Sequence, residues 1–221
     1  MTAVLTTADP RADLAPHLAA YAAIHDAMVR DARRLQRLVA VMDEAVAPGL
    51  ARWWERYETE IEHHHVREDD LVFPLVADRS PGFSADALVA DHVVLDRHLA
   101  GLRRDFDDLG RGVTDLATVR DGLVGRVGAL AEDLRAHLDA EEAAVFPVLA
   151  SRVPADEYAD LERGMRKGMS LRSLAFALPW ILDDLAPDLR AHAEVPMGLR
   201  FLDALVWERS YRNLTRPFRA G

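Results

Sequence analysis

Two stretches of this sequence repeat one pattern of reactive side chains. In each, a histidine is followed four residues later by a glutamate and five residues after that by Phe-Pro, in His64–Pro74 and again in His137–Pro147. Residues at i and i+4 of a helix lie on one face about one turn apart, so each stretch presents an imidazole beside a carboxylate. Such nitrogen and oxygen donors bind transition metals. Two facing copies therefore predict a two-metal site inside a helical bundle.

Further histidines lie on the apolar faces of the other predicted helices. A single buried histidine is more often a core residue with a hydrogen-bond partner than a ligand. Burying a whole set of carboxylates and imidazoles without compensation, however, costs on the order of several kcal/mol per group. A bound pair of cations would supply the compensating charge. The predicted metal ligands are the six polar residues on these faces: His25, His64, Glu68, His92, His137 and Glu141.

These six residues are positioned by four long segments with helical periodicity. Breaks are predicted at Pro48-Gly49, at 78–82 and at 110–112. Long helices with short connections predict an all-α protein with an up-down-up-down four-helix bundle. At ~1.5 Å per residue, the distances from the turns place all six candidate ligands in a slab a few turns thick. The apolar faces run over residues 14–42, 50–75, 88–109 and 116–148.

The bundle accounts for only part of the chain. We expect three regions: a disordered N-terminus over 1–11, the bundle over 12–150 and a C-terminal helical extension over 151–221. The extension is predicted to contain a helix over about 155–184 and, after a proline-rich joint, a final helix from about 197 to 215. Its many apolar and aromatic residues indicate either a cap over the mouth of the site or a homodimer interface. The short linker favours the cap.

Composition narrows the chemistry and the partners. The chain has no cysteine, so any metal must be held by nitrogen and oxygen. Its net charge of −10 argues against a nucleic-acid partner. No apolar run is long enough to predict a membrane span. Residues 1–10 lack the features of a signal peptide, so we expect a cytoplasmic protein.

The donor types favour iron. Four imidazoles and two carboxylates suit iron or manganese, and zinc fits less well because structural zinc prefers a closed tetrahedral cage, commonly with cysteine. The spacing also differs from that of ferritin-type di-iron sites, which use Glu-x-x-His with the carboxylate first. Here the histidine comes first, with the glutamate at i+4.

The order of these residues resembles the hemerythrin-like (HHE cation-binding) domain. The resemblance covers roughly residues 12–150 and includes both Phe-Pro endings. It implies that the six residues are ligands of an oxo- or hydroxo-bridged, non-haem di-iron centre in a four-helix bundle. One glutamate would bridge the two irons. Manganese or zinc is a weaker alternative.

The sequence departs from the oxygen-carrying hemerythrins at two places. His92 is followed at i+4 by Asp96, where the carriers have a second histidine. The last motif has Glu141 at i+4, where the carriers have aspartate at i+5, and Glu142 occupies that i+5 position. Both glutamates are therefore candidates. The match in register with Glu68 favours Glu141.

Four neighbouring residues are candidates for contacts to the ligands or for additional ligation: Tyr57, His65, Asp96 and Glu142. Tyr57 lies seven residues before His64, two turns along the same face, where a core tyrosine would explain it equally well. Tyr21, one turn before His25, is a weaker candidate. His65 lies beside the apolar face, so contact with a ligand is favoured over ligation.

The functions implied by the resemblance all involve a small ligand: O2, NO or H2O2. We expect redox or gas sensing, or protection against oxidative stress, because more carboxylate around iron favours its ferric state and disfavours reversible oxygen binding. A catalase- or peroxidase-like activity is left open. The alternatives are an iron-binding or buffering module and a reversible O2 carrier.

Overall fold

The computed structural model describes residue 11, residues 14–192 and residues 207–219. All regular secondary structure in these residues is helical, which confirms the predicted all-α class. The predicted disordered N-terminus falls largely on residues 1–10, which lie outside the described residues. Arg11 is described, and it forms ion pairs with Asp26 and Glu142.

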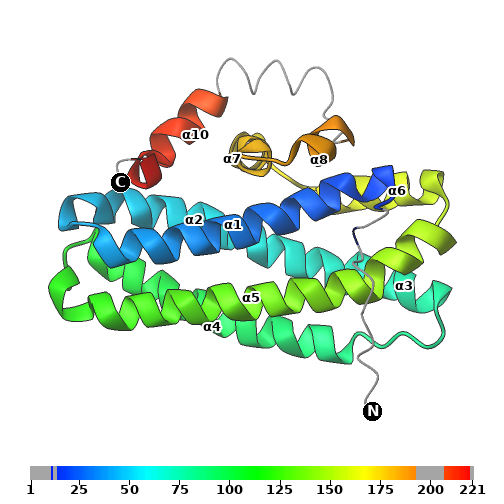
Figure 1. The fold of residues 1–221 in the computed structure, drawn as a ribbon, viewed down its shortest axis with the longest axis horizontal. Helices are drawn as coiled ribbons and strands as arrows, with labels where there is room; N and C mark the ends of the chain where they lie inside the picture. Colours follow the sequence, from blue (N-terminus) through cyan, green and yellow to red (C-terminus); the bar gives the residue numbers. More distant parts are fainter. Residues whose placement is uncertain (1–10, 12–13, 193–206, 220–221) are drawn as a thin grey trace, which may run out of the picture.

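Four long helices run side by side along the length of the molecule (Figure 1). Their bounds are α1 (Ala19–Val41), α2 (Ala47–Arg67), α4 (Asp86–Gly110) and α5 (Leu116–Arg152). Helix α1 packs on α5, α2 packs on α4, and α4 packs on α5. The helical bundle is therefore confirmed, with short connections between consecutive helices.

The first connection begins earlier than the sequence indicated. Helix α1 ends at Val41, and the Asp43 side chain accepts a hydrogen bond from the Val46 N–H in a short 3-10 turn, Glu44–Val46. Pro48 then lies in the first turn of α2. Proline suits that position because its missing N–H has no partner to lose there. The predicted break between the first two helices is therefore present, but it lies at 42–46, and Pro48-Gly49 belongs to the start of α2.

A π-helical turn, Glu68–Val72, joins α2 to α3 (Phe73–Arg79). Pro74 has no N–H, and its ring crowds the carbonyl one turn before it. In the wider turn the Phe73 N–H bonds to the Glu68 carbonyl, which accommodates the proline. The second Phe-Pro lies within the continuous helix α5. The two sequence repeats therefore differ in backbone geometry at one glutamate of the site.

The core consists of two apolar clusters with a polar layer between them. The larger cluster contains Trp53, Trp54 and Phe106, and the smaller one contains Phe73 and Phe146. Five of the six predicted ligands lie along the chain between residues of one cluster and residues of the other, and His137 lies beside Leu138 at the edge of the larger cluster. The two apolar clusters thus cover the polar layer at both ends.

The extension contains shorter helices than predicted. They are α6 (Ala155–Arg166), α7 (Leu171–Leu182), α8 (Pro187–His192) and α10 (Glu208–Leu214), followed by a 3-10 turn, Arg216–Arg219. The single helix predicted over 155–184 was wrong. Helix α6 ends at Arg166, the chain turns through Gly168, whose φ of 85° favours glycine, and the Ser170 side chain caps the start of α7. The predicted helix over 197–215 lies partly outside the described residues.

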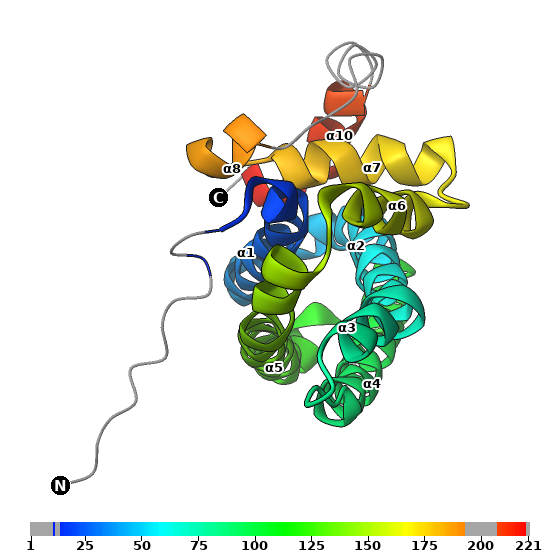
Figure 2. The same ribbon diagram turned by 90° about the vertical axis from the view of Figure 1, so that its right-hand side faces the viewer.

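The extension packs along the outer face of α1 and α2 (Figure 2). The Trp180 indole N–H donates to Asp31 at 2.9 Å, and Arg34 pairs with Asp183 at 2.8 Å. Phe176, Trp180 and Tyr211 are buried in the larger apolar cluster. These aromatic side chains are thus covered within one chain, and the homodimer stays a prediction. None of the described helices has the length and apolarity needed to cross a bilayer.

Candidate metal centre

The six predicted ligands are all buried, each 6% exposed or less. They fall into two groups, and a seventh residue, His65, joins the second. The first group is His25, His64, Glu68 and Glu141; the second is His65, His92 and His137. Within each group, one ligand atom per residue lies within 4.8 Å of those of the others. The arrangement therefore offers two adjacent positions for cations.

The first group brings together side chains from α1, α2, the π-helical turn and α5. The Nε2 atoms of His25 and His64 are 3.1 Å apart. His64 Nε2 is 2.5 Å from Glu68 Oε1, and His25 Nε2 is 3.7 Å from Glu141 Oε2. The donor atoms thus converge on one point from three sides of the bundle.

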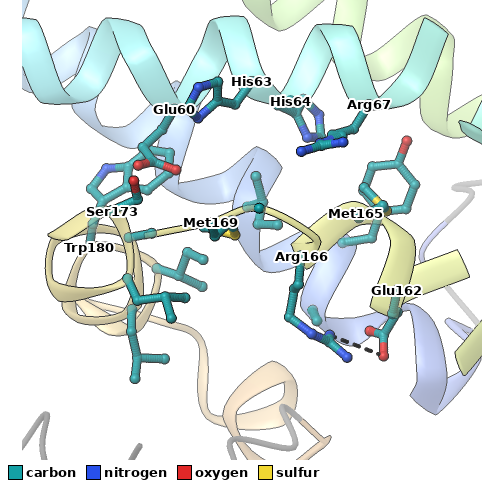
Figure 3. Close-up of a pocket in the computed structure, with 18 of the residues that line it drawn as sticks. Glu60, His63, His64, Arg67, Glu162, Met165, Arg166, Met169, Ser173 and Trp180 are labelled. Atoms are coloured by element: carbon teal, nitrogen blue, oxygen red, sulfur yellow. Dashed lines mark ion pairs between the residues drawn. The ribbon is translucent and has the colours of Figure 1, made fainter. Parts of the chain in front are cut away.

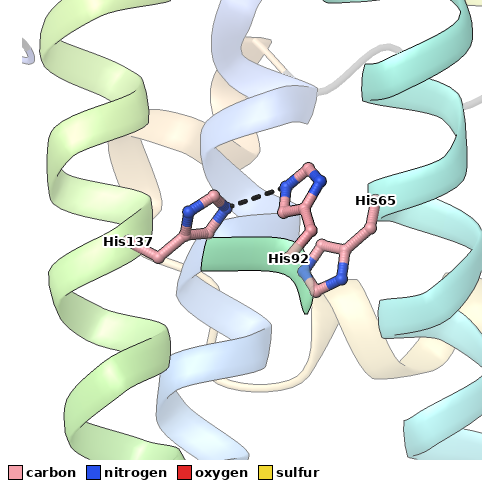
Figure 4. Close-up of side chains that lie close together, drawn as sticks. All are labelled: His65, His92 and His137. Carbon is pink, nitrogen blue, oxygen red and sulfur yellow. Dashed lines mark hydrogen bonds between the residues drawn. The ribbon is translucent and has the colours of Figure 1, made fainter. Parts of the chain in front are cut away.

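The second group contains three imidazoles (Figure 4). The Nε2 atoms of His92 and His137 are 3.1 Å apart. The His65 ring stacks on that of His92 with ring centroids 4.2 Å apart. Consecutive residues of a helix point about 100° apart, so α2 directs His64 to one group and His65 to the other. The sequence contained one indication that His65 is a donor: Asp96 occupies the position at which the oxygen-carrying hemerythrins have a histidine.

Each inner carboxylate faces both groups. Glu68 Oε2 is 3.5 Å from His92 Nε2, whereas its Oε1 faces His64. Glu141 Oε2 is 3.7 Å from His25 Nε2 and also 3.7 Å from His137 Nε2. Carboxylates in this position can bridge two cations. The geometry therefore suits a dinuclear site better than two independent ones.

Buried polar atoms without hydrogen-bond partners test whether a metal pair fits. Among the described residues these include both ring nitrogens of His65, Oε2 of Glu68, Nδ1 of His137 and Oε2 of Glu141. Leaving such atoms unsatisfied costs about 1–3 kcal/mol each. Glu68 Oε2, Glu141 Oε2 and the His65 ring belong to the two groups, so cations bound there would satisfy them. The donor set fits a pair of cations.

Outer carboxylates lie beside the other ring nitrogens. His25 Nδ1 is 2.8 Å from Glu142, and His92 Nδ1 is 3.1 Å from Asp69. His65 Nδ1 is 3.5 Å from Asp96, and His137 Nδ1 is 3.7 Å from Asp91. The first two contacts are hydrogen bonds, and carboxylates bonded in this way orient metal-binding imidazoles and increase their basicity. Of the two candidate glutamates, Glu141 thus lies in the inner group and Glu142 outside it, paired with Arg11.

The tyrosine at the site is Tyr21. Its hydroxyl is 2.8 Å from Glu68 Oε1 and 2.7 Å from Glu141 Oε1. Tyr57 does not reach the site, because two helical turns separate it from His64. Its hydroxyl donates instead to the Met28 carbonyl at 2.7 Å, and its ring stacks on Trp53. The interpretation of Tyr57 as a core residue was the better one.

The comparison with known families agrees with this geometry. The model of the hemerythrin HHE cation-binding domain matches residues 17–149, and a second, overlapping match covers 84–195. The first match includes both candidate groups and more than half of the chain. The chain belongs to the hemerythrin HHE cation-binding family. The searches of curated proteins and of solved structures gave no match.

Burial and neighbouring charges shift the pKa values of the histidines at the HHE site in opposite directions. Although burial lowers the pKa of His25, the carboxylates of Glu141, Glu142 and Glu68 raise it to about 10. Burial lowers the pKa of His64 to about 4 and that of His137 to about 3. The last two imidazoles are therefore neutral near pH 7 and have a lone pair available for a cation.

Burial, and then the neighbouring Glu68 charge, raises the pKa of Glu141 well above its ordinary value. Two carboxylates this close in a dry site repel each other. The Tyr21 hydroxyl has a single proton, so it cannot donate to both at once. Bound cations would remove this conflict by allowing both carboxylates to be ionised. The electrostatics of the HHE site therefore support cation binding.

We expect Tyr21→Phe to weaken metal binding by about 10–100-fold, the usual effect of removing a partner of ligating groups. Tyr57→Phe is the matched control. It loses a hydrogen bond to a backbone carbonyl, so it should lower the free energy of unfolding by about 1 kcal/mol and leave metal affinity unchanged. Competition with a chelator gives the affinities. Equal affinities in the two variants would contradict the role of the Tyr21 hydroxyl.

Proposed function

We propose that this HHE protein holds two iron ions in the polar layer of the bundle and reacts there with O2, NO or H2O2. His25 and His64 would bind one iron. His65, His92 and His137 would bind the other. Glu68 and Glu141 would lie between the two ions. The observation that carries the proposal is the pair of histidine groups with two buried carboxylates facing both.

Iron is favoured over manganese and zinc by the donors. Imidazole together with carboxylate suits iron, and no thiolate is available to form the closed cage typical of structural zinc. A di-iron pair supplies one-electron chemistry toward small oxidants. The protein's own part is to keep the site dry between two apolar clusters and to fix the ligands through the outer carboxylates.

Reaction is favoured over reversible oxygen carriage by the charge around the imidazoles. His65 raises the number of histidines in the two groups to five, so the inner ligands are less carboxylate-rich than the sequence suggested. Two of these five, His25 and His92, however, have a carboxylate within hydrogen-bond distance of Nδ1, and His65 and His137 have one nearby at 3.5 and 3.7 Å. Such partners strengthen the imidazole as a donor and stabilise a more oxidised metal. An iron pair held in this way would favour the ferric state, which suits sensing or oxidative-stress protection.

The test is iron analysis followed by reaction of the reduced protein. We expect about two irons per chain after iron-replete expression, as the two donor groups require. On exposure to H2O2 or NO, the visible absorption should change irreversibly within minutes. An oxygen adduct that forms and is released under vacuum would favour the carrier. Iron binding without any such reaction would favour the iron-buffering module. One zinc and no iron would overturn the proposal.

A further inference from the structure

A cavity of about 600 Å³ lies between α1–α2 and the extension helices α6 and α7 (Figure 3). Its wall is mainly apolar and combines aliphatic and aromatic side chains with Met165 and Met169 from the extension. Tyr21 and His64 of the metal centre also line it. The extension thus encloses, against the bundle, a space whose inner wall includes part of that centre.

The cavity is far larger than O2, NO or H2O2 requires. A water molecule accounts for about 30 Å³ of liquid. Sites for small organic molecules range over roughly 300–1,000 Å³ and combine an apolar wall with a few polar groups. Methionine side chains adapt to the shape of what they contact. The volume and wall therefore match an organic molecule with a largely apolar body.

The charged groups on the wall argue against an ionic ligand. Arg166 pairs with Glu162 at 3.5 Å, and Arg67 donates to the Lys167 carbonyl at 2.7 Å. Both guanidinium groups therefore already bind oxygen atoms of their own chain. An ionised ligand would have to give up its hydration for a mostly apolar wall, which costs several kcal/mol by rough estimate.

One end of the cavity does offer hydrogen bonds. Glu60 on α2 and Ser173 on α7 lie at the same end, away from Met165 and Arg166 (Figure 3). Among the described residues, the Glu60 carboxyl has no hydrogen-bond or ion-pair partner. Burial, partly offset by Arg56, raises the pKa of Glu60 to about 7. The carboxyl can therefore donate or accept a hydrogen bond near neutral pH.

We propose that this cavity binds a neutral, largely apolar organic molecule carrying one hydroxyl or N–H group. The polar group lies at Glu60 and Ser173. The apolar body extends along Met169 and Met165, with one edge against His64. The extension forms one side of the site, and binding there requires no metal. The test of this cavity is therefore independent of the di-iron proposal.

The test uses N-phenyl-1-naphthylamine, a neutral fluorescent probe with one N–H, on the full chain with and without iron. Saturable binding of one probe per chain is expected in both forms. 1-Decanol should displace the probe at concentrations at least about tenfold lower than decanoate or decylammonium, because the ionised ends lose hydration. Equal displacement by decanoate would indicate an anion site and overturn the proposal, as would unsaturable probe uptake.

Variants locate the probe. Ser173→Phe fills the cavity from α7 and should weaken probe binding at least about tenfold, as expected when a bound group and an added ring compete for one space. Arg172→Phe adds the same ring to an exposed neighbour on the same helix and should leave binding unchanged. Equal binding by these two variants would overturn the proposal.

A second pair of variants covers the case in which Ser173→Phe fails to fold. Circular dichroism confirms that each variant is folded before displacement of the probe is measured. Glu60→Gln should retain displacement by 1-decanol. Glu60→Leu should weaken it about tenfold, the loss expected for one hydrogen bond to the ligand. If Glu60→Gln and Glu60→Leu bind 1-decanol equally, the polar end has been misplaced and the proposal fails.

Discussion

Replacing His65 with alanine is expected to lower the iron content from about two ions per chain to about one, because one group loses an imidazole donor out of three. His65 is 3% exposed and belongs to the same donor group as His92 and His137. The His25–His64 group keeps all of its donors in this variant. Iron analysis and the visible spectrum of the loaded protein measure the change.

A second substitution should restore the lost ion. Asp96 lies at i+4 from His92 on α4, and its carboxylate is 3.5 Å from His65 Nδ1. Histidine at position 96 would therefore project from α4 toward the space that the His65 ring leaves. We expect His65→Ala with Asp96→His to bind about two irons again. Iron content separates ligation from packing, because restored ring packing alone would stabilise the iron-free form without returning the lost ion.

The control is His98→Ala on the same helix. Within the described part of the chain, the His98 ring forms a hydrogen bond with Asp133 at 2.9 Å and belongs to neither donor group, so its loss should leave the iron content unchanged. Thermal unfolding with and without iron completes the test, because ligand removal lowers the stability of the loaded form more than that of the iron-free form. Full iron content in His65→Ala would show that His65 only packs against His92.

The sequence was sufficient for the bundle and for six of the seven inner side chains, for a definite physical reason. His25, His64, His92 and His137 occur where apolar residues are required, and buried polar groups demand compensation. The glutamates follow at i+4, so helical geometry alone places them beside their histidines. Local periodicity and a burial argument therefore located the candidate site before any tertiary contact was known.

His65 and Tyr21 depend on tertiary contacts that periodicity does not contain. A residue next to a buried one points about 100° away, and it is buried only if a neighbouring helix covers that side. Helix α4 does so for His65, whose ring stacks on His92. Similarly, Tyr21 and Tyr57 both lie on apolar faces. Only the packing of α1 against α5 decides that Tyr21 reaches Glu141.

The extension was predictable only in part. Its apolar content indicated that it packs against another surface. The continuous apolar pattern over 155–184 predicted one helix, although Gly168 and Ser170 favour the break between α6 and α7. Asp31, a buried acid on α1 that the sequence pattern did not indicate, contributes the polar contacts that hold the extension on this face. Asp31 accepts hydrogen bonds from the Trp180 indole and from Arg30 and Arg34.

Asp31 therefore offers a way to loosen the extension without altering a metal ligand. In Asp31→Ala, the Trp180 N–H loses a buried partner and two arginines lose their shared carboxylate, which costs about 1–3 kcal/mol for each buried group left unsatisfied. Each ~1.4 kcal/mol of lost docking free energy raises the population of the opened form about tenfold. Because α6 and α7 cover the side of the bundle at His64, opening should expose the centre to chelators.

The expected result is that Asp31→Ala binds the same amount of iron as the unaltered chain but loses it to a chelator about ten times faster or more, following that shift in population. Arg172→Ala, on the exposed side of α7, is the control and should lose iron at the original rate. Stopped-flow chelation gives both rates of iron loss. Limited proteolysis of the extension, at sites that follow Val153, measures its opening independently. If Asp31→Ala opens the extension to protease while the chelation rate stays unchanged, the extension does not limit access to the metal centre, and its role is confined to the cavity that it encloses.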